Sequence, residues 1–268
     1  MHPFEGVAHA AAARAGALIR ARYRERPEVS FKGAVDLVTA VDREAETLIV
    51  DALAGAFPEH GIVAEESAAR PSHDGHTWYV DPLDGTTNFA HAYPHFAVSL
   101  ALAREGQLIF GLVYDPVREE LFTAGRGEGA RLNGAPIGVS ETRPLDHALL
   151  GTGFPYDRRE HVEFYLAFWQ EALRRAQGVR RAGSAALDLC WLACGRLDGF
   201  WEWKLRPWDT AGGRLVVEEA GGRVTNFSGG PHELAGEETA ASNTLLHGEL
   251  VRMLADVRLR LGKDRPER

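Results

Sequence analysis

The sequence predicts an α/β protein whose helices and strands form alternating layers. Two observations carry this prediction. Stretches with apolar residues at helical spacing and short apolar runs bounded by turn residues both recur along the chain. Strands dominate the middle of the first half, and helices then alternate with strands from about residue 144 onward. We therefore expect a layered α/β (α+β) sandwich of two tightly joined halves, residues 1–143 and 144–268, with a site between them.

Length and composition are those of a globular protein. The chain has 268 residues, of which 45% are hydrophobic and 25% charged, which excludes a disordered or collagen-like chain. No apolar run approaches the roughly 18 residues of a membrane helix, and no secretory signal is visible at the N-terminus. Cys190 and Cys194 are too few for a disulfide framework, so we expect free thiols and a cytoplasmic protein. The net charge of −8 argues against a general nucleic-acid binder.

The first half is expected to begin with two helices. Residues 4–24 are rich in alanine, and their apolar residues recur near helical spacing. Thr39 is a suitable N-cap for a second helix, with Asp42 at its third position. Pro58 marks the end of this helix.

Five short apolar runs then predict strands at residues 61–64, 78–80, 97–103, 108–114 and 121–123. The Gly-rich stretch 125–129 could suggest a nucleotide loop. It is followed by a hairpin turn signal at Asn133 and Gly134 and not by a helix, so we expect no phosphate cradle there.

The second half is expected to alternate helices with strands. Helices are predicted over residues 160–176, 185–195, 209–220 and 248–261, and strands at 149–150, 199–201 and 239–241. Gly195 and Gly221 end two of the helices. The basic tail from residue 258 to 268 is expected to be a frayed, solvated end.

The most informative segment is WYVDPLDGTTNF (78–89). A strand ends there in Asp81 and Asp84, with Pro82 fixing the turn, and Gly85 leads into residues that can open a helix. Ligand sites in α/β proteins favour the carboxyl ends of strands, and a helix start offers free amides to an anion. Two carboxylates at such a place indicate Mg²⁺ and a phosphoester.

Two other interpretations of this segment compete with the first. One is an aspartyl-phosphate phosphatase, whose nucleophilic aspartate stands two residues before the second one. That position holds Pro82, which cannot attack a phosphate. The other is an ordinary Asp-Gly turn, which leaves the second aspartate and the Thr-Thr-Asn sequence unexplained.

Further acids can join this pair. Glu65 and Glu66 follow the strand at 61–64, and Asp209 stands at a predicted helix start. Taken alone, Asp209 is explained as an N-cap and the glutamates as a solvated turn. Together with the two aspartates they are the set that a site for more than one Mg²⁺ ion needs. His91 and His95 flank a proline, which disfavours a helical metal-binding pair, so we expect packing roles for them.

On these residues the chain resembles the inositol monophosphatase family. The resemblance is carried by VDLVTAVD (35–42), VAEES (63–67), DPLDGTTNF (81–89), GSAALDL (183–189) and LRPWDTAGG (205–213). These segments stand in the family's order and span nearly the whole chain. The residues of GSAALDL and LRPWD resemble the bacterial branch of the family more than the animal branch. The resemblance implies the sugar-phosphatase fold and two or three bound Mg²⁺ ions.

The resemblance also implies a ligand set for these ions. Glu65, Asp81 and the backbone carbonyl of Leu83 would hold the first Mg²⁺, on which the attacking water is bound, so that Glu65 counts as catalytic. Asp81, Asp84 and Asp209 would hold the second ion, which faces the leaving group. Asp84 and Asp209 would contact the substrate as well.

Other matching residues would act on the water and the substrate. Thr86, oriented by Asp42, would help to take a proton from the water. The amides of Gly85 and Thr86 would bind phosphate oxygens. Ala185 and Glu202 would meet substrate hydroxyls.

The expected function is therefore Mg²⁺-dependent hydrolysis of a small phosphomonoester by metal-activated water, with myo-inositol monophosphate as the first choice of substrate. Fructose-1,6-bisphosphate, histidinol phosphate, a nucleotide 3′-phosphate and NADP are alternatives that the ligand set does not distinguish. A non-catalytic regulatory binding protein on the same fold is a further alternative. The resemblance also implies inhibition by Li⁺ and a homodimer, and we expect neither a nucleic acid nor a membrane as partner.

Overall fold

The computed structural model describes residues 3–25, 29–31 and 37–262. The start of the VDLVTAVD segment, residues 35 and 36, lies outside the described residues, and so do the last six residues of the basic tail. Within the described ranges, no helix combines the length and the apolar character that a membrane span requires.

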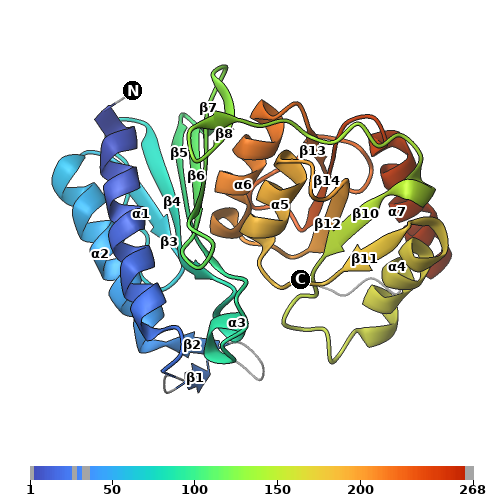
Figure 1. Ribbon diagram of the computed structural model, residues 1–268, viewed down its shortest axis with the longest axis horizontal. Helices are drawn as coiled ribbons and strands as arrows, with labels where there is room; N and C mark the ends of the chain where they lie inside the picture. Colours follow the sequence, from blue (N-terminus) through green and yellow to red (C-terminus); the bar gives the residue numbers. More distant parts are fainter. Residues whose placement is uncertain (1–2, 26–28, 32–36, 263–268) are drawn as a thin grey trace.

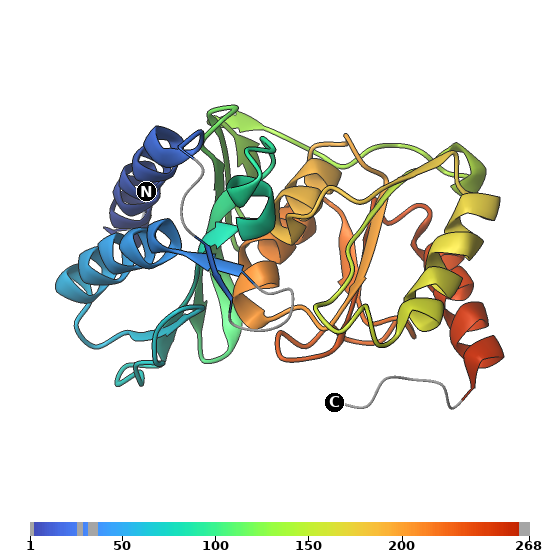
Figure 2. The same cartoon turned by 90° about the horizontal axis from the view of Figure 1, so that it is seen from below.

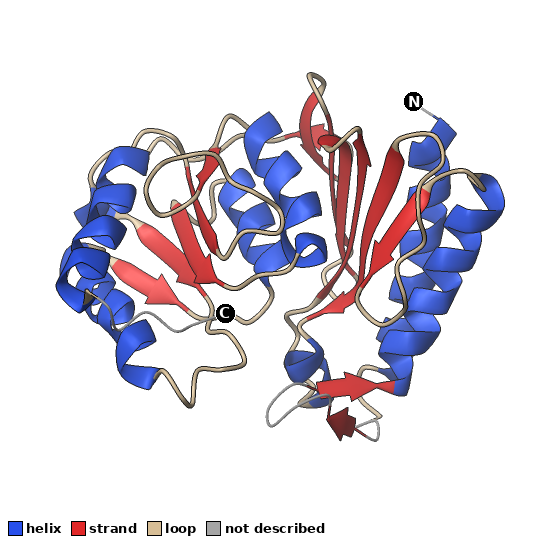
Figure 3. Ribbon diagram, turned by 180° about the vertical axis from the view of Figure 1, so that it is seen from behind, coloured by secondary structure: helices blue, strands red, loops and turns tan. Residues whose placement is uncertain are grey.

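Pairs of helices alternate with sheets (Figure 1). The first pair covers the outer face of a seven-stranded sheet, the second lies between this sheet and a five-stranded sheet, and the third covers the far side (Figures 1 and 3). In that order the pairs are α1 (Pro3–Arg22) with α2 (Ala40–Ala56), α5 (Ala185–Ala193) with α6 (Pro207–Glu219), and α4 (Val162–Arg175) with α7 (His247–Leu261). The view from below shows the same succession (Figure 2). The layered α/β architecture expected from the sequence is confirmed.

The seven-stranded sheet contains all five strands predicted in the first half. Its strands, in spatial order, are β3 (Gly61–Ala64), β4 (His76–Asp84), β5 (Ala97–Arg104), β6 (Gln107–Asp115), β7 (Glu120–Gly125), β8 (Gly129–Leu132) and β9 (Ala135–Pro136). Only β3 and β4 pair in parallel. The Gly-rich stretch forms the β7–β8 turn, and the amides of Gly127 and Gly129 donate to the Glu219 carboxylate. Those amides therefore already have an anionic acceptor from within the chain.

The five-stranded sheet has the order β11-β10-β12-β14-β13. Its strands are β10 (Leu149–Thr152), β11 (Gly178–Arg180), β12 (Gly199–Trp203), β13 (Arg223–Thr225) and β14 (Glu238–Ser242). The three-residue strands β11 and β13 were not predicted, because so short a run shows no periodicity. The small β1 (Val29–Phe31) and β2 (Leu37–Thr39) pair with each other, and α3 (Thr86–Ala90) is a single short turn of helix. The boundary at residues 143 and 144 stays a prediction.

Helix starts follow local chemistry. Thr39 is the N-cap of α2, as predicted, and forms a capping box with Asp42. The alternative that Asp209 is an N-cap is wrong, because α6 begins two residues earlier, at Pro207. Proline suits the first turn of a helix, where no backbone N–H is needed. Asp209 therefore sits at the third helical position and accepts from the Arg206 amide at 2.7 Å.

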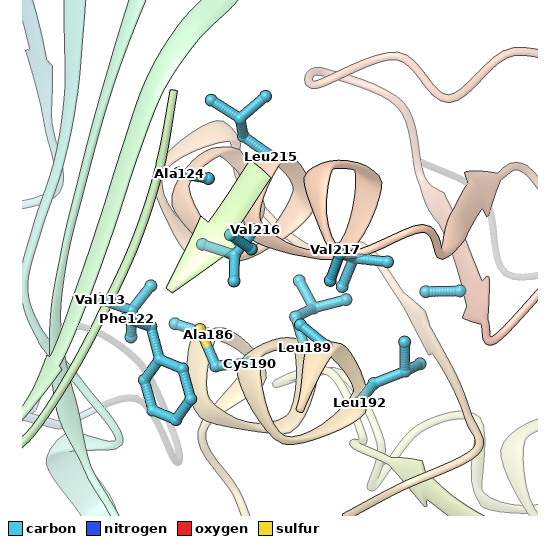
Figure 4. Packing of buried hydrophobic residues seen from close by; sticks show 14 of the residues in the cluster. Val113, Phe122, Ala124, Ala186, Leu189, Cys190, Leu192, Leu215, Val216 and Val217 are labelled. Carbon is cyan, nitrogen blue, oxygen red and sulfur yellow. The ribbon is translucent and has the colours of Figure 1, made fainter. Parts of the chain in front are cut away.

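The central core lies between the seven-stranded sheet and the α5–α6 pair. Figure 4 shows Val113 and Phe122 of the sheet together with Cys190 of α5 and Val216 of α6, and all four side chains are fully buried. α6 approaches the sheet closely enough for backbone contact, because a Cβ built on Gly111 would lie 2.7 Å from the carbonyl oxygen of α6 residue Gly212. This contact sets α6, and with it Asp209, against the sheet.

Gly111→Ala is expected to lower the free energy of unfolding by about 1–3 kcal/mol, because the added methyl would push α6 off the sheet. Gly55, exposed near the end of α2 with nothing within 4 Å of an added methyl carbon, is the matched control. There alanine is expected to add up to about 1 kcal/mol through helix propensity. Urea unfolding measures both variants, and equal effects would contradict the close packing of α6.

Candidate active site

The paired aspartates lie at the carboxyl end of β4, beside the end of the parallel strand β3, which Glu65 follows directly. The strand ends in these two aspartates, as expected, and is longer than the apolar run at residues 78–80 because β4 spans His76–Asp84. Its pairing with β5 is irregular between these two residues. Pro82 explains the irregularity, since proline has no N–H for the ladder. Asp81 Oδ1 accepts from the Leu83 amide at 2.9 Å, which closes the local turn.

The chain then turns sharply into α3. Gly85 has φ +101°, a left-handed conformation in which a Cβ would lie 3.0 Å from the carbonyl oxygen of His95. Thr86 is buried and its hydroxyl donates to Asp42 Oδ1 at 2.8 Å, with the carbonyl oxygen of Leu83 at 3.1 Å. The structure therefore brings Asp42 of α2 and Thr86 together, across 44 positions of sequence.

Asp84 connects β4 to the start of α5. Its Oδ2 accepts from the Ser184 hydroxyl at 2.6 Å and from the Ala186 amide at 2.7 Å. Ser184 is the N-cap of this helix, and Ala185 is its first residue and is buried. Of this segment, only Ala185 was predicted to belong to the site. The serine ahead of an apolar helical run was the signal that could have added Ser184.

Two further carboxylates come from the second half of the chain. Asp209 is carried by α6 and Glu202 by β12, where its side chain is buried. Glu202 packs directly against the backbone of Gly153, where a Cβ would collide with the carboxylate. Side chains from both sheets and from α6 thus meet at one place.

Burial and mutual repulsion raise the pKa values of these acids. The pKa of Asp81 lies well above its usual range because the carboxyl is buried, with Glu65, Asp84 and Asp209 adding repulsion. Burial first, and then neighbouring acids, also raise the pKa values of Asp209 and Glu202, although the charge of Arg181 opposes the rise at Glu202. Burial raises the pKa of Asp84 to about 6, although its hydrogen bonds to the start of α5 oppose the rise. The charges of Glu65 and Asp84 thus act on both Asp81 and Asp209.

This donor set fits hard divalent cations. Its members are carboxylate oxygens and a backbone carbonyl, the ligands that Mg²⁺ prefers, and a cation would relieve their repulsion. Among the described residues, no three of these acids bring one oxygen each within 4.8 Å of one another. Oxygens that share one Mg²⁺ lie within roughly 4.2 Å of one another, so binding an ion requires these carboxylates to draw closer together than they stand here.

Two acids that support the site were missed. Glu46, one helical turn after Asp42, accepts from the Glu66 amide at 2.8 Å and holds the segment that follows β3. Asp188 Oδ1 lies 3.7 Å from His95 Nε2, and both side chains are buried. The pair faces Asp84, whose pKa Asp188 raises and His95 lowers.

The two histidines of the DPLDGTTNF region differ in their surroundings. His95 packs edge-on against Trp191, with the ring centroids 4.9 Å apart, in line with the packing role expected for it. His91 is exposed, and its backbone amide donates to the Thr87 carbonyl at the end of α3. α3 ends at Ala90, so His91 and His95 do not lie on one helix.

Comparison with known proteins gives a consistent result. The inositol monophosphatase family model matches residues 1–259. The Nus factor SuhB of Escherichia coli (strain K12) is 45% identical over 246 residues, which cover 91% of this chain and 92% of that protein. The structure of the extragenic suppressor protein suhB from Bartonella henselae has a TM-score of 0.91 and 41% identity, covering 94% of this chain and 98% of that one. The inositol monophosphatase from Anabaena (Nostoc) sp. PCC 7120 has a TM-score of 0.86 and 42% identity, covering 94% and 95%.

Proposed function

Because this chain belongs to the inositol monophosphatase family, as its motifs predict, we propose that it hydrolyses myo-inositol monophosphate in a Mg²⁺-dependent reaction. Family membership supports a phosphatase that acts on a phosphorylated small molecule. The observation that supports the finer proposal most is that the charges of Glu65 and Asp84 raise the pKa values of both Asp81 and Asp209. This group of acids is accompanied by the hydrogen-bonded pair Asp42 and Thr86.

We assign the ligands as the motifs imply. One Mg²⁺ would be held by Glu65, Asp81 and the Leu83 carbonyl. A second would be held by Asp81, Asp84 and Asp209. The proposal includes two or three ions and assigns ligands to two of them. When bound, such ions lower the pKa of water and screen the charge of a phosphoryl group. Asp81 is the acid shared by both sets.

Thr86 and Asp42 would accept the proton of the attacking water. The Thr86 hydroxyl donates its own proton to Asp42 Oδ1, so an oxygen lone pair of Thr86 is left to accept one from water. Burial raises the pKa of Asp42 above its ordinary value, although bonds from Thr39 and Thr86 oppose the rise. A raised pKa makes Asp42 a stronger base for the proton that Thr86 passes on.

Thr86→Val is expected to lower kcat by about 10²–10⁴-fold with little change in KM, because the variant keeps the shape of the side chain and loses the proton path. Thr86→Ser keeps the hydroxyl and is expected to retain most of the activity. Steady-state phosphate release measures both. A valine variant that loses only substrate affinity would contradict the assigned role.

The remaining residues would bind the substrate. The amides of Gly85 and Thr86 would donate to phosphate oxygens, and Gly85 has no side chain that could stand between the turn and a ligand. Ala185 and Glu202 would contact ring hydroxyls, together with Asp84 and Asp209. We propose Glu202 as the residue that sets substrate preference, because it lies on β12, outside the segments that carry the proposed metal ligands.

The test is phosphate release from a panel of phosphomonoesters with and without Mg²⁺. The panel contains inositol 1-phosphate, fructose-1,6-bisphosphate, histidinol phosphate, a nucleotide 3′-phosphate and NADP, and Asp84→Asn is the control. Turnover of inositol phosphate that requires Mg²⁺ and collapses in the variant supports the proposal. Preference for another ester would keep the mechanism and replace the substrate.

A second candidate is a regulatory binding role without catalysis. It is favoured by the relatives named Nus factor SuhB, at 45% identity over most of the chain. If folded protein with metal present releases no phosphate from any ester of the panel, this result would support the regulatory role over the phosphatase.

We also propose the other properties that the resemblance implies, namely inhibition by Li⁺, a homodimer and a cytoplasmic location. Light scattering on a gel-filtration column tests the dimer. A filter-binding assay without salt-sensitive affinity for nucleic acid would agree with the expected absence of such a partner.

A further inference from the structure

A second group of metal-binding side chains lies at the amino ends of β3 and β4, away from the acids of the candidate active site. His60 directly precedes β3, and Asp74 and His76 stand where β4 begins. Asp74 Oδ2 lies 3.4 Å from His60 Nε2 and 3.0 Å from His76 Nδ1. One ligand atom from each residue falls within 4.8 Å of the other two, and no other group of the described residues meets this condition.

The distance from the candidate active site follows from the strand. His76 and Asp81 are five positions apart on β4, and a strand rises about 3.3 Å per residue, so the two places are roughly 16 Å apart. The same two strands thus carry oxygen donors at one end and imidazoles at the other.

The backbone holds these three side chains in position. Residues 70–74 run back past β3, where Ile62 and Arg70 exchange two backbone hydrogen bonds of 3.0 and 2.8 Å. Gly75 turns the chain with φ +83°, and Asp74 Oδ1 accepts from the His76 amide at 3.0 Å. The rings of His60 and His76 stack with their centroids 4.6 Å apart. The group is therefore built by the fold of the β3–β4 connection.

We propose that His60, Asp74 and His76 bind a divalent transition-metal ion, Zn²⁺. Two imidazoles and one carboxylate suit Zn²⁺, and they differ from the all-oxygen set that suits Mg²⁺. Three protein ligands leave a fourth position for water. His60 and His76 are half-buried and Asp74 is exposed, so an ion can reach all three from solvent. The site is independent of the proposed phosphatase activity.

The hydrogen bond from Trp78 determines which nitrogen of His60 can bind the ion. The indole Nε1 of Trp78 donates to His60 Nδ1 at 3.0 Å. A neutral imidazole that accepts at Nδ1 carries its proton on Nε2, the atom that faces Asp74. Zn²⁺ at Nε2 displaces this proton to Nδ1, so the indole N–H loses its acceptor. The proton count of the ring is unchanged, and Trp78 becomes a reporter of binding.

The first measurement is a calorimetric titration of the whole protein with Zn²⁺ in the presence of saturating Mg²⁺, which occupies the oxygen-rich site. One equivalent is expected to bind to the wild-type chain. His76→Ala and Asp74→Asn are each expected to weaken binding at least about tenfold, since even loss of an outer-shell partner of a metal commonly costs that much. Asp74→Asn changes an exposed side chain and keeps the test valid if His76→Ala folds poorly.

His73→Ala is the matched control. His73 is exposed and adjacent in sequence, and its backbone amide, which bonds to the Glu59 carbonyl, is kept in the variant. Its Zn²⁺ affinity is expected to equal that of the wild type. In the proton NMR spectrum, Zn²⁺ is expected to shift the indole N–H signal of Trp78 in the wild type and in this control.

Two outcomes would overturn the proposal. In one, His76→Ala and Asp74→Asn bind Zn²⁺ as tightly as the wild type. In the other, Asp81→Asn abolishes Zn²⁺ binding while both of these variants retain it, which places the ion in the oxygen-rich site. Failure of the phosphatase assay would leave both readouts unaffected, because neither depends on turnover.

Discussion

Asp81→Asn is expected to lower kcat at least about 10³-fold and, in metal-free protein, to raise Tm by several degrees. Activity falls because Asp81 is the acid assigned to both Mg²⁺ ions. Stability rises because the buried carboxyl has a raised pKa and is repelled by Glu65 and by other neighbouring acids, so its charge opposes folding at neutral pH. Asparagine has the same size and can still accept from the Leu83 amide. Phosphate release and thermal unfolding in a chelator measure the two effects.

Asp115→Asn is the matched control for this prediction. Asp115 is equally buried, but it accepts from the amides of Val117 and Arg118 and pairs with the Arg118 guanidinium at 2.6 Å. Its charge is therefore compensated within the chain. We expect this variant to lose stability and to keep kcat. A loss of Tm in metal-free Asp81→Asn as well would contradict the account of Asp81 as a repelled charge.

Mg²⁺ is expected to stabilise the protein far more at about pH 7.5 than at about pH 5. The pKa of Asp84 is raised to about 6 in the folded chain, against an ordinary value of 3.8. Below about pH 4 both states hold the proton and nothing is lost. As the pH rises toward 6, the unfolded chain gives up the proton first, so metal-free stability falls, by up to about 3 kcal/mol for Asp84. Bound Mg²⁺ removes this loss, because it favours the charged form.

Thermal unfolding across this pH range, with and without Mg²⁺, measures the effect. Asp84→Asn is the control, since it removes one of the titrating acids and with it part of the pH dependence of the metal-free protein. Calorimetry in two buffers of different ionisation enthalpy is expected to show proton release on Mg²⁺ binding near pH 6 and less above it. Equal stabilisation by Mg²⁺ at both pH values would contradict the prediction.

Local features of the fold were predictable where a few neighbouring residues decide them. Thr39 caps α2 because its own side chain and that of Asp42 satisfy the first amides of the helix. The hairpin at Asn133 and Gly134 follows from two residues that tolerate positive φ, +49° and +81°. The predicted start of α6 is two residues too late. The helix begins at Pro207, so Asp209, whose residue type suits an N-cap, is already inside its first turn.

The candidate site was predictable in its residue types and not in its contacts. The types follow from motifs that lie within single segments of sequence. The contacts join segments that are far apart in the sequence. The Ser184 hydroxyl donates a hydrogen bond to Asp84, 100 positions away, and Glu46 accepts one from the Glu66 amide, 20 positions away. The local sequence does not predict which distant residue each of them contacts. Each of these polar residues, taken alone, is equally typical of a cap or a solvated turn.

The sequence by itself therefore determined the layered α/β class, the order of most helices and strands, and the acids on which the proposed function rests. The class and the elements depend on periodicity, caps and turns, which act over a few residues. The acids stand in motifs that lie within single segments. The tertiary structure alone decided that Asp81 is buried among like charges, that Asp84 is tied to α5, and that His60 meets Asp74 and His76. Burial and Coulomb repulsion depend on distances in space. The packing of the sheets with α5 and α6 sets the distances around Asp81 and Asp84, and the β3–β4 connection sets those among the three metal-binding side chains.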